Sequence, residues 1–301
     1  MSKKIIAILL ALSFVFAFAA CGGKNDTETT TALEETTVDP FAEVEDTTAA
    51  DVVEDTTAAE GETEAVAEEE TTLAEGETVA EEETTEAAVA MPQTKEEIVA
   101  AFNTAVNAVK ADGKSVKRSY SKISLNGSPV LPSAVNGILK LLGGAEEFLN
   151  DQLAKNSKGE ETYTGSQITA VFPVEGESYA SKLTAADVKE AKITEKDGKW
   201  IIRISTIDDA KSDSIQHGQG HAPKAFNVVL PGVVNDNIPG VATSLVGLST
   251  MNYPSSTCTV TVDPATGRAI TADYYLNWTI NFDKVGVVIP FTTNDYFTIT
   301  Y

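Results

Sequence analysis

The sequence predicts an α+β domain: a curved antiparallel sheet with long C-terminal strands, whose apolar face is covered by helices from the start of the domain. Two observations support this class. In 268–282, RAITADYYLNWTINF, apolar and polar residues alternate over thirteen positions, which is typical of a strand with one dry and one wet face. The longest helical patterns occur earlier, within 94–156. Early helices followed by one-sided antiparallel strands indicate the α+β class.

The first helix is expected at 94–112. Thr94 and Glu97 have the spacing of a capping box, and Asp112-Gly113 ends the pattern. Its apolar residues fall on one face at helical spacing: Ile98, Phe102, Ala105, Val106 and Val109. A strand is expected at 115–125. A second helical stretch at 132–156 is divided by Gly143-Gly144.

Strands are expected in most of the remaining domain. Residues 166–173, SQITAVFP, alternate briefly, and Thr184 with Asp187 predicts a short helical turn. Asp197-Gly198 is typical of a type I′ hairpin turn. The last strand, from 287 onward, has its apolar residues in one phase: Val287, Ile289, Phe291, Phe297 and Ile299.

The amino-terminal region, residues 1–20, has the pattern of a signal peptide. Lys3 and Lys4 precede an apolar run of about sixteen residues, shorter than the roughly twenty that a spanning helix needs. The run ends in Ala-Ala directly before Cys21, which resembles the lipobox of bacterial lipoproteins, with Phe18 in place of the usual leucine. The resemblance implies that Cys21 carries diacylglycerol and a further fatty acid such as palmitate, and anchors the protein at the extracellular face of the cytoplasmic membrane. The alternative is an ordinary signal peptide cut near Ala20.

Residues 21–90 form the lipidated cysteine and an acidic segment rich in Thr, Glu and Ala. From 24 to 90 there are 23 acidic residues and one lysine, so most of the chain's net charge of −23 lies here. Repeats such as VEDTTAA have irregular periods and almost no aromatic residues, which predicts a disordered tether. Such spacers resemble those of surface lipoproteins from clostridial Gram-positive bacteria, some of which are glycosylated on threonine. The tether is expected to project the globular domain, 91–301, into the cell wall or beyond.

The element order together with lipidation resembles the half-barrel of LolA- and LppX-type lipoproteins, which carry lipids between a sheet and helices. Residues 226–254 are apolar but do not alternate. They are interpreted as a loop and helix covering the core, or alternatively as the mouth of an apolar ligand site. In the second case the helix at 135–153 would form the other wall. The pocket would then be lined by Ile138, Leu142, Val241, Leu245 and Leu248.

The strongest candidate for chemistry is the stretch DDAKSDSIQHGQGHAPKAF. His217 and His221 have the H-x-x-x-H spacing of a zinc site, with Asp213 as a third ligand. The intervening Gly-Gln-Gly disfavours a helix, and no glutamate follows the first histidine, so a mobile polar loop is the favoured interpretation. Cys258 alternates with threonines on an expected strand and is interpreted as a small buried residue rather than a reactive thiol.

These observations favour a non-enzymatic, membrane-anchored surface lipoprotein that binds a lipid, another apolar molecule or a cell-envelope component. No cofactor is expected, and the four bases in 114–122 do not indicate nucleic-acid binding. The first alternative is a metal-dependent extracellular enzyme that uses His217 and His221. The second is a structural or adhesive envelope protein that contacts its partner through Tyr275 and Tyr296.

Overall fold

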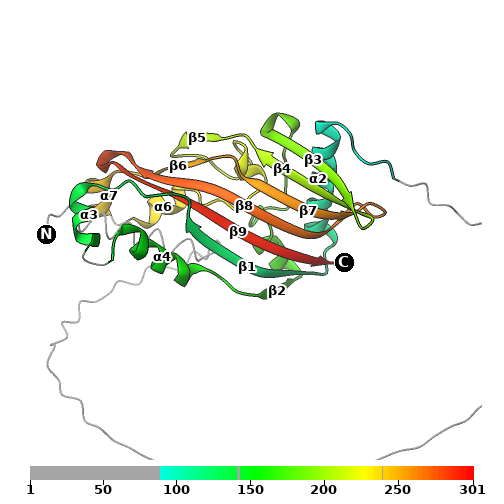
Figure 1. The fold of residues 1–301 in the computed structure, drawn as a ribbon, viewed down its shortest axis with the longest axis horizontal. Coiled ribbons are helices and arrows are strands. Elements are labelled where there is room, and N and C mark those ends of the chain that lie inside the picture. The colour runs from blue at the N-terminus through cyan, green and yellow to red at the C-terminus, as the bar shows by residue number, and fades with distance from the viewer. Residues whose placement is uncertain (1–88, 141–142, 239) are drawn as a thin grey trace, which may run out of the picture. The chain divides into compact units, whose positions relative to one another are not determined.

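The structure is a computed structural model that describes residues 89–301, apart from 141–142 and 239. Cys21, the acidic segment and Leu142 therefore lie outside the described residues. The elements (Figure 1) are α2 (Lys95–Asp112), β1 (Ser115–Leu125), α3 (Ser133–Leu139), α4 (Ala145–Asn156), β2 (Glu161–Thr164), α5 (Ser166–Val171), η2 (Ala185–Asp187), β3 (Val188–Lys196), β4 (Lys199–Thr206), β5 (Asp209–Ser212), η3 (Ala222–Lys224), α6 (Pro231–Asn237), α7 (Gly240–Val246), β6 (Thr250–Tyr253), β7 (Thr257–Asp263), β8 (Arg268–Phe282), η4 (Asp283–Val285) and β9 (Val287–Thr300).

The strands form one mostly antiparallel sheet of nine strands, which confirms the α+β class. Its main path runs β2-β1-β9-β8-β7-β4-β3, and β6 pairs with both β5 and β8. The two longest strands, β8 and β9, lie side by side in its centre (Figure 1). Because β8 is longer than its neighbours, β7 pairs with its first half and β6 with its last residues.

Helix α2 begins as its sequence predicts. The Thr94 hydroxyl accepts a hydrogen bond from the Glu97 amide, and the Glu97 carboxylate accepts one from the Thr94 amide, so both arms of the capping box are present. The expected apolar face is buried, with Val99 added to it. This face contacts β8, β3 and β4. Burial against the sheet supplies most of the stability of such a helix.

The alternation in β8 and β9 is confirmed, with one shift. Ala272, Tyr274 and the following alternate residues of β8 are buried, but Ile270 is only half-buried and Ala269 takes the inward position. The cause is a bulge against β7, where Thr261 pairs with Thr271 but Val262 pairs with Ala269. An extra residue in one strand moves the following side chains to the other face.

The strand expected from SQITAVFP is wrong, because Ser166–Val171 is the short helix α5. Thr164, the end of β2, pairs with Ser115, which is the first residue of β1. The chain beyond Thr164 therefore has no strand left to pair with on that side. Four alternating residues cannot distinguish a strand from a helix, and here local hydrogen bonding with burial of Ile168 prevails.

The predicted break between two helices and the predicted hairpin turn are both confirmed. Gly143 and Gly144, both with positive φ, separate α3 from α4. Asp197 and Gly198 have φ of 53° and 69°, which the type I′ turn between β3 and β4 requires. The apolar segment 226–254 contains α6, α7 and β6. No helix in the described part of the chain is long and apolar enough to cross a membrane.

Candidate ligand-binding cleft

A cleft of about 700 Å³ opens between the inner, core-bearing face of β1 and β9 and three segments that pass over it. These segments are the turn after α5, the loop at 216–217 and the stretch 227–236 with α6. A volume of this size suits a small-molecule ligand. The lining residues are Arg118, Ser121, Ile123, Lys158, Val171, Glu175, Gly176, Gln216, His217, Asn227, Val228, Val229, Leu230, Gly232, Val233, Asp236, Thr293, Asp295 and Phe297.

Two features of the strands place polar side chains on the inner face of the sheet: polar residues at inward positions of β9, and a register shift in β1. In β9, Thr293 and Asp295 occupy the inward phase between Phe291 and Phe297. In β1, the register shifts between Arg118 and Tyr120, so that Arg118 and Ser121 both line the cleft although three positions separate them. A bulge re-aims a strand in this way and is common beside functional sites.

Arg118 is a buried base in the cleft lining, and only some of its hydrogen-bond donors have a partner in the described part of the chain. It is 5% exposed, and its Nη2 donates to Glu161 Oε2 at 3.0 Å. Its guanidinium carbon also lies 5.2 Å from the ring centroid of Tyr163. The Nε of Arg118, however, is buried and has no hydrogen-bond partner among the described residues. A buried charged donor without an acceptor costs free energy.

Asp295 and Lys158 lie on either side of Ser121. Ser121 pairs with Asp295 in the sheet, and its amide and carbonyl both bond the backbone of Lys158. Asp295 is 9% exposed. Neither Asp295 nor Lys158 belongs to any of the ion pairs within the described ranges. The cleft therefore contains an acid and a base that form no direct ion pair among the described residues.

Glu175 faces the cleft from the turn after α5, where Asn227 holds it. The Asn227 amide donates to Glu175 Oε1 at 3.1 Å and to the Val171 carbonyl at 3.0 Å, and its oxygen accepts from the Glu175 amide at 2.9 Å. From α2, Lys110 Nζ donates to the carbonyls of Val174 and Glu177 at 2.5 and 2.8 Å. These bonds fix the backbone of the turn and, with it, the carboxyl group of Glu175.

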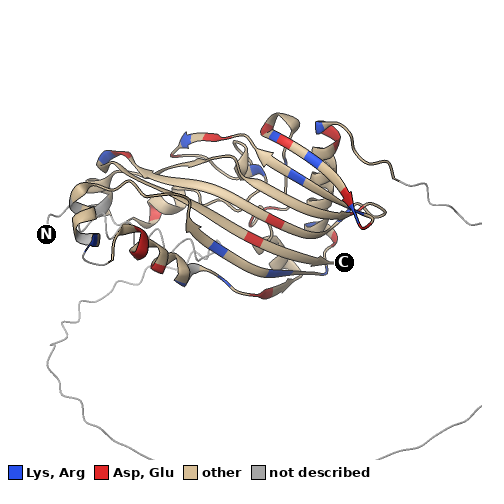
Figure 2. Cartoon of the chain, in the orientation of Figure 1, with Lys and Arg blue, Asp and Glu red and all other residues tan. Residues whose placement is uncertain are grey.

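The two carboxyl groups are harder to ionise than carboxyls in water. Burial raises the pKa of Glu175 to about 7, and the charge of Asp295 adds to the shift while Lys158 and Arg118 oppose it. Burial also raises the pKa of Asp295, against a hydrogen bond from Ser121 and the charge of Arg118. Charged residues are sparse on β8 and β9 (Figure 2), so the buried Asp295 is unusual within the sheet. A carboxyl with a pKa near 7 exchanges protons with a ligand at neutral pH.

His217 also lines the cleft, apart from the second histidine of the predicted metal set. Its Nδ1 is buried without a partner in the described structure, and burial lowers its pKa. The Gly-Gln-Gly that follows turns the chain, since Gly218 and Gly220 have φ of 75° and 65°. A Cβ on Gly220 would lie 2.4 Å from Asp209 Oδ1, so only glycine fits there.

His221, the second histidine, serves a different polar cluster. Its Nδ1 lies 2.9 Å from Asp187 Oδ1, and its amide donates to Asp209 at 2.6 Å. Burial alone would raise the pKa of Asp187, but hydrogen bonds from Lys224, Thr184 and His221 bring it to about 2. Asp213 is exposed on the loop. The described residues contain no group of three or more His, Cys, Asp or Glu side chains that could hold a metal ion, so the predicted set gains no support.

Of the five residues predicted for an apolar pocket, only Leu245 and Leu248 can be compared with the cleft. The side chains of Ile138 and Val241, like Leu142, lie outside the described structure. Leu245 packs against the core, whereas Leu248 is 55% exposed, and neither lines the cleft. The segment 226–254 does contribute, but through its first third at 227–236.

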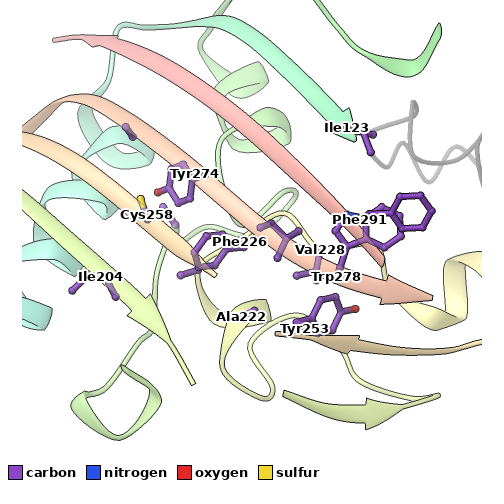
Figure 3. Close-up of a cluster of buried hydrophobic side chains, with 14 of the residues drawn as sticks. Ile123, Ile204, Ala222, Phe226, Val228, Tyr253, Cys258, Tyr274, Trp278 and Phe291 are labelled. Carbon is purple, nitrogen blue, oxygen red and sulfur yellow. The ribbon is translucent and has the colours of Figure 1, made fainter. Parts of the chain in front are cut away.

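Apolar side chains lie beside the charged part of the cleft. Figure 3 shows Ile123 and Val228, both lining residues, close to the inward residues of β8 and β9. The Trp278 indole donates to Thr293, a lining residue, at 3.0 Å. Cys258 is fully buried, which confirms its role as a small core residue, and burial raises its pKa. The cleft therefore combines apolar and charged surfaces.

The outer face of the sheet carries the tyrosines of the adhesive alternative. Tyr275 is 49% exposed, and Tyr296 stacks on Tyr120 with ring centroids 6.0 Å apart. Neighbouring polar side chains bond each other, as Asn294 does with Asp273 at 2.7 Å. On this face, neighbouring polar and aromatic side chains contact each other, whereas in the cleft Arg118 and His217 each have a guanidinium or ring nitrogen without a partner among the residues that the structure describes.

The sequence contained a signal for the cleft that the alternation alone obscured. Two polar residues, Thr293 and Asp295, stand at consecutive inward positions of an otherwise apolar strand face. Polar residues at core-facing positions mark functional sites more often than structural ones. The turn with Glu175 had no comparable signal, because its position depends on long-range bonds from Lys110 and Asn227.

Comparisons with known proteins provide no template for this cleft. No family model matches the chain, and no similar protein was found among the curated proteins or the solved structures.

Proposed function

We propose that the protein is a membrane-anchored extracellular lipoprotein whose globular domain binds one amphiphilic small molecule in the cleft. The observation that carries this proposal is Arg118, a base only 5% exposed that lines the cleft between β1 and β9. An acidic group of the ligand would accept from the guanidinium group of Arg118, and its apolar part would lie along Ile123, Val228 and Phe297. Cys21 would provide the anchor, and the acidic segment would act as the tether.

Two further parts of the account are proposals of the same kind. The first is that α2 and its neighbouring helices cover the apolar face of the sheet. It is supported by the shared hydrophobic cluster of Phe102 and Val106 with the inward residues of β8 and β9. The second is that the chain resembles lipid-carrying lipoproteins of the LolA and LppX type, which the mixed sheet-and-helix cleft favours.

The test begins from the full chain with a protease site inserted after Ala87. The lipidated protein is purified from membranes, and the folded domain is then released by the protease without refolding. Native mass spectrometry of this domain should show extra mass that organic extraction removes. Domain at its calculated mass alone would contradict the proposal.

Variants localise the ligand. Arg118→Gln should lose the extra mass, because the acidic group loses its buried donor and charge. The matched control is Arg203→Gln, since Arg203 lies exposed on β4 and does not line the cleft. Thermal unfolding of both variants establishes that they are folded. Retention of the ligand by a folded Arg118→Gln variant would place the ligand elsewhere.

A further inference from the structure

The cleft contains charges of both signs that are not paired with each other. Lys158, Glu175 and Asp295 belong to no ion pair in the described structure, and Arg118 is paired only with Glu161 at the edge strand. Folding alone does not favour the two acids here, because their carboxyls lose hydration on burial and the charges of Arg118 and Lys158 offset that loss only in part. A ligand that carries both signs would pair all of them at once.

The positions of these residues divide the charges into two sets. Arg118 and Lys158 are the bases of the cleft lining, and one donor of Arg118 already bonds Glu161. Glu175 and Asp295 are two acids of the same lining. Burial raises the pKa of both carboxyls and the charge of Asp295 adds to the shift of Glu175, while Arg118 and Lys158 lower the pKa of both. The hydrogen bond from Asn227 occupies Glu175 Oε1, and no protein cation pairs with either carboxylate. The carboxyl pair therefore offers a site for a positive group.

We propose that the ligand of the cleft is zwitterionic, with an acidic group bound by Arg118 and Lys158 and an ammonium group bound by Glu175 and Asp295. This inference rests on the proposed function, because it specifies the polar end of the same amphiphile. A phosphate or carboxylate joined to an amine has the required chemistry. The apolar residues of the cleft then contact the remainder of the molecule.

The test compares three probes with the same six-carbon chain: hexylphosphocholine, hexyl phosphate and hexyltrimethylammonium. They carry both charges, the acidic group alone and the cation alone. Binding to the released domain, stripped of bound molecules by organic extraction and checked for folding, is measured by calorimetry. The fluorescence of Trp278 is a second readout, because its indole bonds Thr293 at the cleft. A Trp200→Phe background removes the signal of the other tryptophan.

Hexylphosphocholine should bind at least about tenfold more tightly than either single-charge probe, which corresponds to about 1.4 kcal/mol. Its binding at pH 7 should also release protons, since a nearby cation favours ionised Glu175. Equal or tighter binding of hexyl phosphate would overturn the inference in favour of a purely acidic ligand. Equal or tighter binding of hexyltrimethylammonium would overturn it in favour of a cation.

Variants assign each charge. Glu175→Gln keeps the acceptor for Asn227, and it should remove the advantage of hexylphosphocholine over hexyl phosphate. Arg118→Gln should weaken hexylphosphocholine and hexyl phosphate but not hexyltrimethylammonium. Glu160→Gln, at an exposed ion pair with Lys117, is the matched control and should change none of the three affinities. Unchanged selectivity in a folded Glu175→Gln variant would refute the carboxyl assignment.

Failure of the inference and failure of the proposed function give different results. If the domain released from cells carries a bound molecule but the zwitterionic probe has no advantage, only the ligand class is wrong. If none of the three probes binds and the released domain is also bare, the proposed function itself fails.

Discussion

Replacing Asn107 with alanine should destabilise the domain and loosen one side of the cleft. Asn107 lies on α2, and its oxygen accepts from the amides of Ala180 and Ser181 at 2.7 and 2.9 Å. Its amide donates to the Ser181 carbonyl at 2.9 Å. Ala180 and Ser181 are almost fully buried. This single side chain therefore satisfies three backbone groups of the segment that follows the Glu175 turn.

The expected loss of stability follows from those three backbone groups. Each buried backbone group left without a partner costs about 1 kcal/mol or more, so Asn107→Ala should lower the free energy of unfolding by about 3 kcal/mol. Urea unfolding of the released domain, followed by tryptophan fluorescence, measures this change. The matched control is Asn237→Ala, which removes one exposed bond to the Val233 carbonyl and should cost well under 1 kcal/mol. A loss below about 1 kcal/mol for Asn107→Ala would refute the role assigned to these bonds.

Two further predictions concern the helix start and the titration of the cleft. Thr94→Ala removes the capping hydroxyl of α2 and should cost about 1 kcal/mol in the same unfolding assay, whereas no measurable loss would contradict the capping role. Glu175 has a pKa of about 7 in the folded state, above its ordinary value of 4.5, so the folded state binds more protons between these values. The free energy of unfolding should therefore fall as pH rises from 4.5 to 7, by at most about 3 kcal/mol. Glu175→Gln should remove that part of the slope, and an unchanged slope would show that another group titrates.

The sequence predicted the parts of the fold whose signals are local and long. The fifteen residues of β8 and the fourteen of β9 alternate far enough that only a strand accommodates them. The capping box of α2 and the Asp197-Gly198 turn are equally local. SQITAVFP misled because it is short, and its helical state depends on where β1 begins to pair with β2. The bulge at Ile270 also depends on the partner strand, so it could not be read from β8 alone.

The cleft was harder to predict because tertiary structure assembles it. His217 stood out through its spacing from His221, yet the fold sends one ring to the cleft and the other to Asp187. Arg118 looked like one of several bases on an ordinary strand, and the bulge that brings Ser121 beside it in the cleft depends on the pairing with β9. The apolar stretch 226–254 was interpreted first as a cover of the core and only alternatively as the mouth of a ligand site, and part of it lines the cleft together with charged residues of β1 and β9 that were not predicted.

The most direct test of the central claim is a crystal structure of the domain released from the full chain with its bound molecule retained. The account predicts ligand density between β1 and β9 on one side and 227–236 on the other. An oxygen of that ligand should lie within hydrogen-bonding distance of the Arg118 guanidinium group. A cleft filled only by ordered water, with the bound molecule at another surface, would contradict it.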